Sequence, residues 1–135
     1  MNFIFVSICI LKKKEQILIT KRPSHKLFGG FWEFPGGKLE NTETFEEAMA
    51  RELYEELGIR INIKNLKSLD ILNHSYDKKN YIVMNLFCCN KWDGKIRNRD
   101  TKKFVWINKT GPFPNKFLEG GLLILKRLKN GYYKL

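Results

Sequence analysis

The sequence predicts a single α/β domain, folded as an α/β/α sandwich around a mixed central sheet. Three observations support this fold class: apolar runs of strand length, a well-capped amphipathic helix near the middle of the chain, and a second helical pattern near the carboxyl terminus. The 135 residues contain no repeat, linker or low-complexity tract. Residues 1–135 therefore form one domain, which is large enough to bury a core without disulfides.

The first half of the chain consists of two strands, a loop and a helix. Residues 2–11 are apolar and predict a strand, which turns at residues 12–15 into a second strand at residues 16–21. Residues 23–30 contain proline and glycine and predict a loop. A helix follows at about residues 45–57.

The second half of the chain continues with a hairpin, a short strand and a helix. Residues 62–76 and 80–91 predict two long strands that turn at residues 77–79. Residues 104–107 predict a short strand. Apolar residues at helical spacing predict a final helix over residues 116–129.

The helix at residues 45–57 is marked at both ends. Thr44 and Glu47 have the spacing of a capping box, in which each side chain binds the backbone N–H of the other residue. Gly58 occupies the position of a left-handed carboxyl-terminal cap. One side of the helix carries an apolar stripe for packing, made of Met49, Ala50, Leu53 and Leu57.

Three carboxylates occupy the neighbouring side of this helix. At about 3.6 residues per turn, Glu52, Glu55 and Glu56 project from one face. Their charges repel one another unless a cation lies between them. Mg2+, or Mn2+ in its place, is a hard cation that takes oxygen ligands and binds substrate phosphates. The sequence therefore predicts a metal site here, against the alternative of a solvated acidic face.

The spacing of these residues resembles the Nudix box, Gly-x5-Glu-x7-Arg-Glu-(aliphatic)-x-Glu-Glu-x-Gly-(aliphatic). Its fixed positions are filled by Gly37, Glu43, Arg51, Glu52, Leu53, Glu55, Glu56, Gly58 and Ile59. The preceding segment, residues 32–38, is similar to the MutT-like branch of the family, and the similarity is strong over residues 17–59. One departure is Thr42, where many relatives carry glycine, and it is expected to alter the loop and not the metal site.

The resemblance implies the Nudix fold and a hydrolase that cleaves phosphoanhydride bonds with Mg2+. The metal ligands that it implies are Glu52, Glu55, Glu56 and the backbone carbonyl of Gly36. Either Glu52 or Asp100 would deprotonate the attacking water, and the alternative for Asp100 is a solvated loop residue. Arg51 is expected to orient Glu55, four residues away, while Glu43 braces the loop before the helix.

The resemblance also implies residues that bind the nucleotide. Arg22 can clamp the outer phosphates with its guanidinium, with a surface role as the alternative, and Lys38 is expected to contact substrate. Asn115 occupies a position from which MutT-like enzymes present an amide to a purine edge, although the same residue could cap the following helix. The aromatic residues expected to form a slot for the base, or else to belong to the core, are Phe34, Tyr76 and either Phe3 or Phe5.

The function that the resemblance implies is hydrolysis of a nucleoside triphosphate to a nucleoside monophosphate and pyrophosphate. The expected substrate is an oxidised purine nucleotide such as 8-oxo-dGTP, and the expected role is sanitation of the nucleotide pool. A relative directed to CTP, or to nucleotides in general, is the alternative within this class, because such relatives share much of residues 32–38. A non-catalytic basic module that binds nucleic acid is the alternative of a different class.

Charge and cysteine content bear on partners and location. A net charge of +11 and a pI near 9.7 would suit nucleic acid, but the lysines are scattered, so nucleic-acid binding is not expected. Non-catalytic Nudix-like modules typically lose the acidic triad, which this chain retains. Three cysteines without CxxC spacing, together with an apolar start too short to span a bilayer, predict a cytosolic protein with no membrane partner. It is expected to be a monomer.

Overall fold

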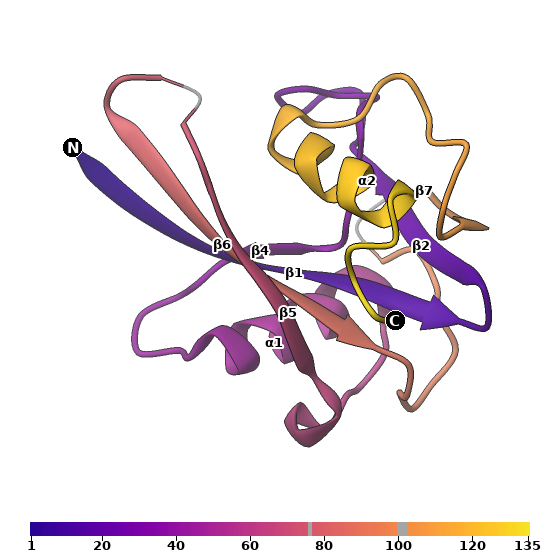
Figure 1. Ribbon diagram of the computed structural model, residues 1–135. Helices are drawn as coiled ribbons and strands as arrows, with labels where there is room; N and C mark the ends of the chain where they lie inside the picture. Colours follow the sequence, from indigo (N-terminus) through magenta and orange to yellow (C-terminus); the bar gives the residue numbers. More distant parts are fainter. Residues whose placement is uncertain (76, 100–102) are drawn as a thin grey trace.

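Figure 1 shows the computed structural model of the protein, which describes residues 1–75, 77–99 and 103–135. Strands dominate the first part of the chain, and the two α-helices lie far apart in the sequence. In chain order the elements are β1 (Asn2–Lys13), β2 (Gln16–Lys21), β3 (Trp32–Glu33), β4 (Gly36–Lys38), α1 (Phe45–Leu57), η1 (Ile63–Asn65), β5 (Lys67–His74), β6 (Asn80–Cys89), β7 (Lys103–Asn108), η2 (Glu119–Gly121) and α2 (Leu122–Lys129).

Strand β1 organises the sheet because it pairs along its whole length. On one side it runs parallel to β6, from the pair Asn2–Asn80 to the pair Leu11–Cys89, and β5 lies antiparallel on the outer side of β6. On its other side β1 pairs with β4 near its middle and with β2 at its end. Strand β2 continues the sheet to β3 and β7, and these pairs are antiparallel. The predicted mixed sheet is therefore confirmed.

Two apolar cores lie on opposite faces of the sheet, one beneath each helix (Figure 1). Because successive strand residues point to opposite faces, Ile10 lies in the core under α2, while Cys9 and Leu11 lie in the core under α1. Helix α1 adds Met49, Leu53 and Leu57 to its core, as predicted, whereas the fourth residue of the predicted stripe, Ala50, is only half-buried and Ala48 is buried instead. The layers are helix, sheet and helix, which confirms the predicted sandwich.

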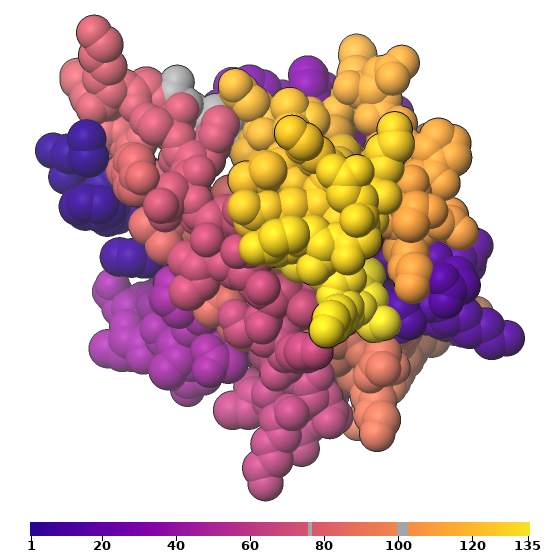
Figure 2. Space-filling model, viewed as in Figure 1, coloured from indigo at the N-terminus to yellow at the C-terminus, as the bar shows by residue number. Residues whose placement is uncertain are grey.

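The carboxyl-terminal segment is held against the sheet by a polar contact. The space-filling view shows helix α2 and the tail, in yellow, gathered over the middle of one face (Figure 2). Beneath them, Asp70 of β5 accepts hydrogen bonds from the guanidinium of Arg127 and, at 2.7 Å, from the hydroxyl of Tyr133. Desolvation raises the pKa of Tyr133, and its bond to Asp70 adds to that effect.

Most elements have the predicted positions. Helix α1 and strand β2 have the predicted bounds, β1 ends at Lys13, and β7 covers the predicted short strand. The predicted hairpin is confirmed as β5 and β6, but residues 63–65 form a 3-10 helix where strand was predicted. Strands β3 and β4 were not predicted, because they are short and a proline and glycines interrupt the alternation that marks a strand.

The prediction of a helix from residue 116 was wrong in its first part. Residues 116–118 are not helical, residues 119–121 form a 3-10 helix, and the α-helix begins at Leu122. Strand β3 accounts for the difference, because the Trp32 N–H donates to the Lys116 carbonyl and the Leu118 N–H donates to the Trp32 carbonyl. Tertiary pairing thus overrides the helical spacing of the apolar residues.

Two further expectations concern the membrane and the thiols. Within the part of the chain that the structure describes, neither helix is long and apolar enough to cross a bilayer. Cys9 and Cys89 are buried, Cys88 is half-buried, and all three are free thiols. Burial raises the pKa of each thiol, which disfavours the reactive thiolate.

Candidate active site

The segment from residue 32 to residue 38 links the sheet to helix α1. The Cys9 N–H donates to the Pro35 carbonyl, which ties the segment to β1. The N–H of the following residue, Gly36, donates to the Glu56 carboxylate at 3.1 Å. Gly36 has a φ of +150°, and a Cβ there would lie 2.0 Å from the carbonyl oxygen of Ser7. The segment can therefore lie this close to β1 only because Gly36 has no side chain, and in this position its N–H reaches Glu56.

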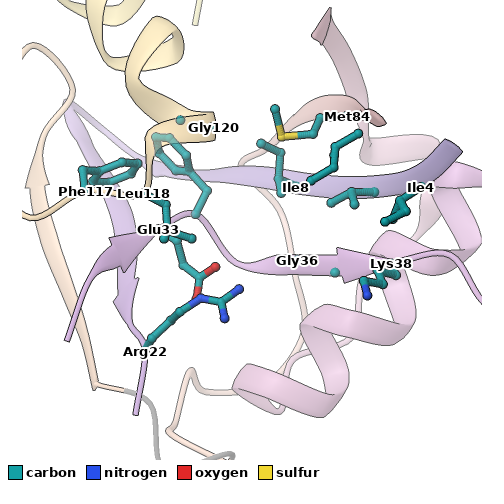
Figure 3. Close-up of a pocket in the computed structure, with 15 residues that line it drawn as sticks. Ile4, Ile8, Arg22, Glu33, Gly36, Lys38, Met84, Phe117, Leu118 and Gly120 are labelled. Atoms are coloured by element: carbon teal, nitrogen blue, oxygen red, sulfur yellow. The ribbon is translucent and has the colours of Figure 1, made fainter. Parts of the chain in front are cut away.

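A pocket of about 190 Å³ lies between this segment, strands β1 and β6, and the residues before α2 (Figure 3). Its wall is largely apolar, and three charged side chains also line it, with Arg22 and Glu33 on the side of Phe117 and Lys38 on the side of Ile4 (Figure 3). The apolar lining consists of Ile4, Val6, Ile8, Phe34, Ile82, Met84, Phe117 and Leu118. The charged lining consists of Arg22, Glu33 and Lys38. An apolar cavity with a few convergent polar groups is the usual form of a small-molecule site.

Three of the residues predicted to bind substrate line this pocket. They are Arg22, Phe34 and Lys38. Arg22 is held by an ion pair, with 3.1 Å between its Nε and an oxygen of Glu33. Phe34 is only 3% exposed, and its ring lies 5.3 Å from that of Phe117 in an edge-on contact. Phe34 is thus part of the core and of the pocket wall at once.

The other predicted substrate residues lie elsewhere. Asn115 is exposed and lies two residues before Phe117, outside the pocket lining. Its alternative role as a helix cap is wrong, because Leu118 and Gly121 occupy the cap positions of η2 and α2. Tyr76 and Asp100 lie outside the described residues.

Neither Phe3 nor Phe5 lines this pocket, although one of them was expected to line the slot for the base. Strand β1 contributes Ile4, Val6 and Ile8, which alternate along the strand with the phenylalanines. Phe3 and Phe5 therefore point to the other face of the sheet, where they are 60% and 46% exposed.

Helix α1 begins and ends as the sequence predicts. The Thr44 hydroxyl accepts a hydrogen bond from the Glu47 N–H at 3.1 Å, and the Glu47 carboxylate accepts one from the Thr44 N–H at 2.9 Å. Gly58 has a left-handed φ of 72°, and its N–H donates to the Tyr54 carbonyl. These two caps fix the ends of the helix and therefore the turns in which its carboxylates lie.

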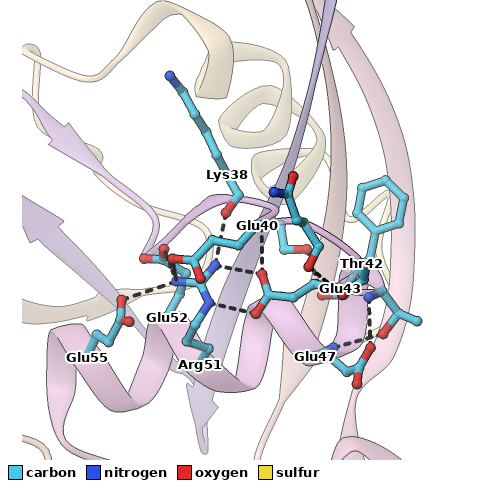
Figure 4. Close-up of polar contacts among 12 residues, drawn as sticks. Lys38, Glu40, Thr42, Glu43, Glu47, Arg51, Glu52 and Glu55 are labelled. Atoms are coloured by element: carbon cyan, nitrogen blue, oxygen red, sulfur yellow. Dashed lines mark hydrogen bonds and ion pairs between the residues drawn. The ribbon is translucent and has the colours of Figure 1, made fainter.

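Arg51 lies at the centre of a network of carboxylates (Figure 4). It binds Glu43 with two hydrogen bonds, at 2.7 and 2.9 Å. It also donates to Glu52 at 2.9 Å, to Glu55 at 3.2 Å and to the Lys38 carbonyl at 3.0 Å. The expected contact with Glu55 is present, but Glu43 is the closer partner. The Arg51 guanidinium lowers the pKa of Glu43, and the Glu43 hydrogen bond raises the pKa of Arg51.

The three predicted metal ligands differ in exposure. Glu56 is only 3% exposed, whereas the side chains of Glu52 and Glu55 are 15% and 49% exposed. A Cβ at Gly37 would lie 2.6 Å from the Glu52 carboxylate, so a glycine is needed there for Glu52 to lie against the backbone. The carboxylates thus lie along the side of α1 that faces the glycine segment.

A hard divalent cation prefers oxygen ligands, and the carboxylates of α1 offer them. Across residues 1–75, 77–99 and 103–135, no three acidic, histidine or cysteine side chains already lie together as ligands. Arg51 holds Glu52 and Glu55, and Glu56 receives the Gly36 N–H. The oxygen donors themselves suit a hard cation such as Mg2+. The chemistry of the residues therefore fits, and Arg51 fixes the positions of Glu52 and Glu55.

Sequence reasoning missed some residues of this site. Glu33 was not predicted as a site residue, although it directly precedes Phe34, which was predicted. It forms an ion pair with Arg22 in the pocket. Ile8 and Met84 line the pocket but carry no local sign of it, because each lies in an ordinary apolar strand. Only the register of β1 and β6, which pairs Val6 with Met84 and Ile8 with Leu86, brings Ile8 and Met84 to the same wall.

Comparisons with known proteins identify the family. The NUDIX domain model matches residues 1–113. An 8-oxo-dGTP diphosphatase of Proteus vulgaris is 39% identical over 90 residues, which cover 67% of this chain and 78% of that protein. The CTP pyrophosphohydrolase of Escherichia coli is 29% identical over 109 residues, which cover 80% of this chain and 78% of that protein. A solved structure from a study of MutT from Aliivibrio salmonicida and Vibrio cholerae has a TM-score of 0.78 at 30% identity, covering 96% of this chain and 99% of its own. The chain belongs to the Nudix family and has the fold of its MutT members.

Proposed function

We propose that this Nudix hydrolase is a Mg2+-dependent nucleoside triphosphate pyrophosphohydrolase that releases a nucleoside monophosphate and pyrophosphate. Its preferred substrate is an oxidised purine nucleotide such as 8-oxo-dGTP, and its role is to remove such nucleotides from the pool. The observation that carries the proposal is the row of carboxylates on α1 beside a pocket that Arg22 and Lys38 both line. The name of the Proteus vulgaris relative supports the choice of base.

The chemistry of the site suits cleavage of a phosphoanhydride bond. Such a reaction needs neutralised phosphate charge, an aligned water and a stabilised leaving group. Nudix hydrolases generally use divalent metals, and a bound Mg2+ would neutralise charge and make a water more acidic. The residues that would hold it are Glu52, Glu55, Glu56 and the carbonyl of Gly36. Glu52 or Asp100 would accept the proton of the attacking water, and Arg51 keeps Glu52 and Glu55 in place at 2.9 and 3.2 Å.

The pocket is suited to one part of a nucleotide. Its volume of about 190 Å³ is below the roughly 300 Å³ at which pockets for whole drug-sized ligands begin. We assign it to the base, which would lie between the apolar residues of β1 and the ring of Phe34. Arg22 would bind outer phosphates, and Asn115, with Tyr76, would contact the base from outside the lining. An amide can serve as both donor and acceptor to a purine edge.

A CTP-directed or general nucleotide pyrophosphohydrolase is the second candidate. It is favoured by the similarity to the Escherichia coli CTP pyrophosphohydrolase. The two candidates share the carboxylates and the glycine segment, so they differ only in what the pocket accepts. A direct comparison of substrates therefore separates them.

A substrate panel tests the proposal. Pyrophosphate release would be measured with 8-oxo-dGTP, dGTP and CTP at equal concentration, with and without Mg2+. We expect release only with the metal, and the highest kcat/KM for 8-oxo-dGTP. A higher kcat/KM for CTP would favour the second candidate. Tight binding of RNA without turnover of any nucleotide would contradict both and favour the nucleic-acid-binding module.

Two variants make the panel specific to the site. Glu56→Gln should lower kcat by about a hundredfold or more, because the buried carboxylate is lost as a ligand while its shape is kept. Glu46→Gln makes the same change in the first turn of the same helix and should leave kcat unaltered. Equal rates for Glu56→Gln and the unaltered protein would remove the assigned metal site. Asn115→Ala should raise the KM for 8-oxo-dGTP more than that for dGTP.

We further propose that the protein acts as a monomer in the cytosol without a nucleic-acid partner. Its cysteines are free, and the buried pair Cys9 and Cys89 suits a reducing compartment. Basic side chains are spread over several elements and do not form one stripe along a single helix or strand. Size-exclusion chromatography with light scattering would measure the mass against the 16.0 kDa of one chain.

A further inference from the structure

The carboxyl-terminal end of α1 concentrates negative charge. Glu52, Glu55 and Glu56 lie in its last two turns, and the helix dipole adds about half a negative charge at the same end. The last turn contains no basic side chain. Arg51 pairs with Glu52 and Glu55 from within the helix, and the last carbonyl groups are bound by groups that follow the helix or lie outside it.

A loop segment before β7 supplies these groups. The Arg97 N–H donates to the Leu57 carbonyl at 3.0 Å, and the Arg99 N–H donates to the Glu56 carbonyl at 3.1 Å. The guanidinium of Arg99 also donates from Nη1 to the Tyr54 carbonyl at 3.3 Å. Arg99 thus binds the last turn of α1 with both its backbone and its side chain.

The ring of Tyr54 holds the Arg99 side chain in position. The guanidinium carbons of Arg99 and Arg60 lie 4.8 and 4.6 Å from the centroid of this ring. All three side chains are exposed, so stacking and hydrogen bonding, and not burial, define their positions.

We propose that Arg99 is a positioning residue, which fastens the last turn of α1 and so keeps Glu55 and Glu56 placed for metal binding. It acts through the carbonyl groups of Tyr54 and Glu56 and does not itself contact the metal or the nucleotide. The assignment of Glu55 and Glu56 as ligands comes from the proposed function, and the inference rests on it. Arg60 provides the comparison, because it stacks on the same ring and, among the described residues, has no side-chain bond to a carbonyl of α1.

Metal binding without any substrate tests the inference. Mn2+ would be titrated into the nucleotide-free protein, and the free ion followed by electron paramagnetic resonance. Arg99→Ala should need about fivefold more Mn2+ for half-saturation, because a hydrogen bond from a charged group is lost. Loss of a nearby positive charge alone would favour cation binding, so weaker binding reports the loosened turn. Arg60→Ala removes the same charge from the same ring and should stay within about twofold of the unaltered protein.

Hydrogen exchange gives a second measurement that needs no activity. The amides of residues 56–58 should exchange faster in Arg99→Ala than in Arg60→Ala, because the last turn opens more often. Arg99→Lys keeps a cation that can reach the Tyr54 carbonyl and should recover part of the Mn2+ affinity. Equal Mn2+ affinity in Arg99→Ala and the unaltered protein, or an equal loss in Arg99→Ala and Arg60→Ala, would overturn the inference. So would a lysine variant no better than the alanine variant.

The kinetic result separates this inference from the proposed function. If nucleotides are hydrolysed, Arg99→Ala should raise the Mg2+ concentration for half-maximal rate and leave the KM for the nucleotide within about twofold. A rise in nucleotide KM with unchanged Mg2+ dependence would count against positioning through α1. If the unaltered protein hydrolyses no nucleotide, the proposed function fails, while the Mn2+ titration and hydrogen exchange still decide the role of Arg99.

Discussion

At the scale of single residues, Thr42 adopts a backbone conformation that suits glycine better than threonine. Its φ is +67°, which lies in the left-handed region. A Cβ, and especially a branched one, crowds the backbone in that region. The loop before α1 therefore carries strain at the position where the Nudix resemblance favours glycine, and the residues of α1 that we propose as metal ligands are not directly involved.

We predict that Thr42→Gly stabilises the protein. The relief of left-handed strain should exceed the entropy that glycine adds to the unfolded chain, for a net gain of about 0.5–1 kcal/mol in the free energy of unfolding. Urea denaturation would measure it. Thr110→Gly, at a position without positive φ, is the control and should destabilise. A loss of stability in both variants would show that the strain at Thr42 is negligible.

Local spacing predicted some residue contacts and missed others. Arg51 and Glu55 are one helical turn apart, so their pairing follows from helix geometry. The closer pairing of Arg51 with Glu43 spans a loop and a helix start, and its two-bond geometry depends on how the loop folds back. The ion pair between Arg22 and Glu33 depends on the pairing of β2 with β3, which alternation alone did not reveal.

At the scale of elements, α1 is tied to the loop before it by a pH-dependent contact. The hydrogen bond from Arg51 lowers the pKa of Glu43 below its ordinary value. A carboxylate of this kind stabilises the fold at pH values above its unfolded pKa of about 4.3. That stabilisation is lost as the pH falls through the lower pKa of the folded state. The loop and the helix should therefore separate more easily in acid.

We predict that Glu43→Gln destabilises the protein at neutral pH and not in acid. The free energy of unfolding should fall by about 1 kcal/mol at pH 7, because a charged two-bond pair with Arg51 is weakened. The difference in free energy of unfolding between the variant and the unaltered protein should disappear as the pH falls below the pKa of Glu43 in the folded state. Thermal unfolding from pH 7 to pH 3 would measure it, with Glu46→Gln as the control. A difference that stays constant with pH would contradict the role of the Glu43 charge.

Elements with strong local signals were predicted well, and elements made by pairing were not. The caps of α1 gave its bounds, because a capping box and a left-handed glycine act within a few residues. The start of α2 was missed, since residues 116–118 pair with β3 instead of continuing the helix. The short strands β3 and β4 exist because β2 and β1 provide partners for them.

At the scale of the whole molecule, the Asp70 carboxylate links the sheet to the carboxyl-terminal layer. Asp70 of β5 binds Arg127 of α2 and Tyr133 of the tail, and its side chain is 16% exposed. Helix α2 also covers one of the two cores, so its attachment affects the pocket wall at Phe117. The polar contact and the apolar packing therefore act on the same layer.

We predict that Asp70→Asn lowers the free energy of unfolding by about 1–2 kcal/mol, because two partly buried donors lose a charged acceptor. Tyr133→Phe removes only one of the two bonds and should cost less. Urea denaturation would compare the variants, and hydrogen exchange of α2 would locate the effect. If Tyr133→Phe costs as much as Asp70→Asn, the Arg127 contact contributes nothing.

The overall sandwich could be predicted, whereas the pocket could not. Apolar runs and two helical patterns indicate layers, but they do not give the strand order. The parallel pairing of β1 with β6 joins residues about 80 positions apart, and this register places Val6 beside Met84 in the pocket wall. The cavity is a product of five segments that meet only in the folded chain.

The shared strand β1 has a consequence for how the protein tolerates change. Ile10 serves one core, while its neighbours Cys9 and Leu11 serve the other. Inserting or deleting one residue in this strand would exchange the two sets of side chains, so both halves would lose their fit in the same event. Both cores depend on the register of this one strand. We therefore expect natural length variation to accumulate in the connecting turns, and the protein to melt as one unit.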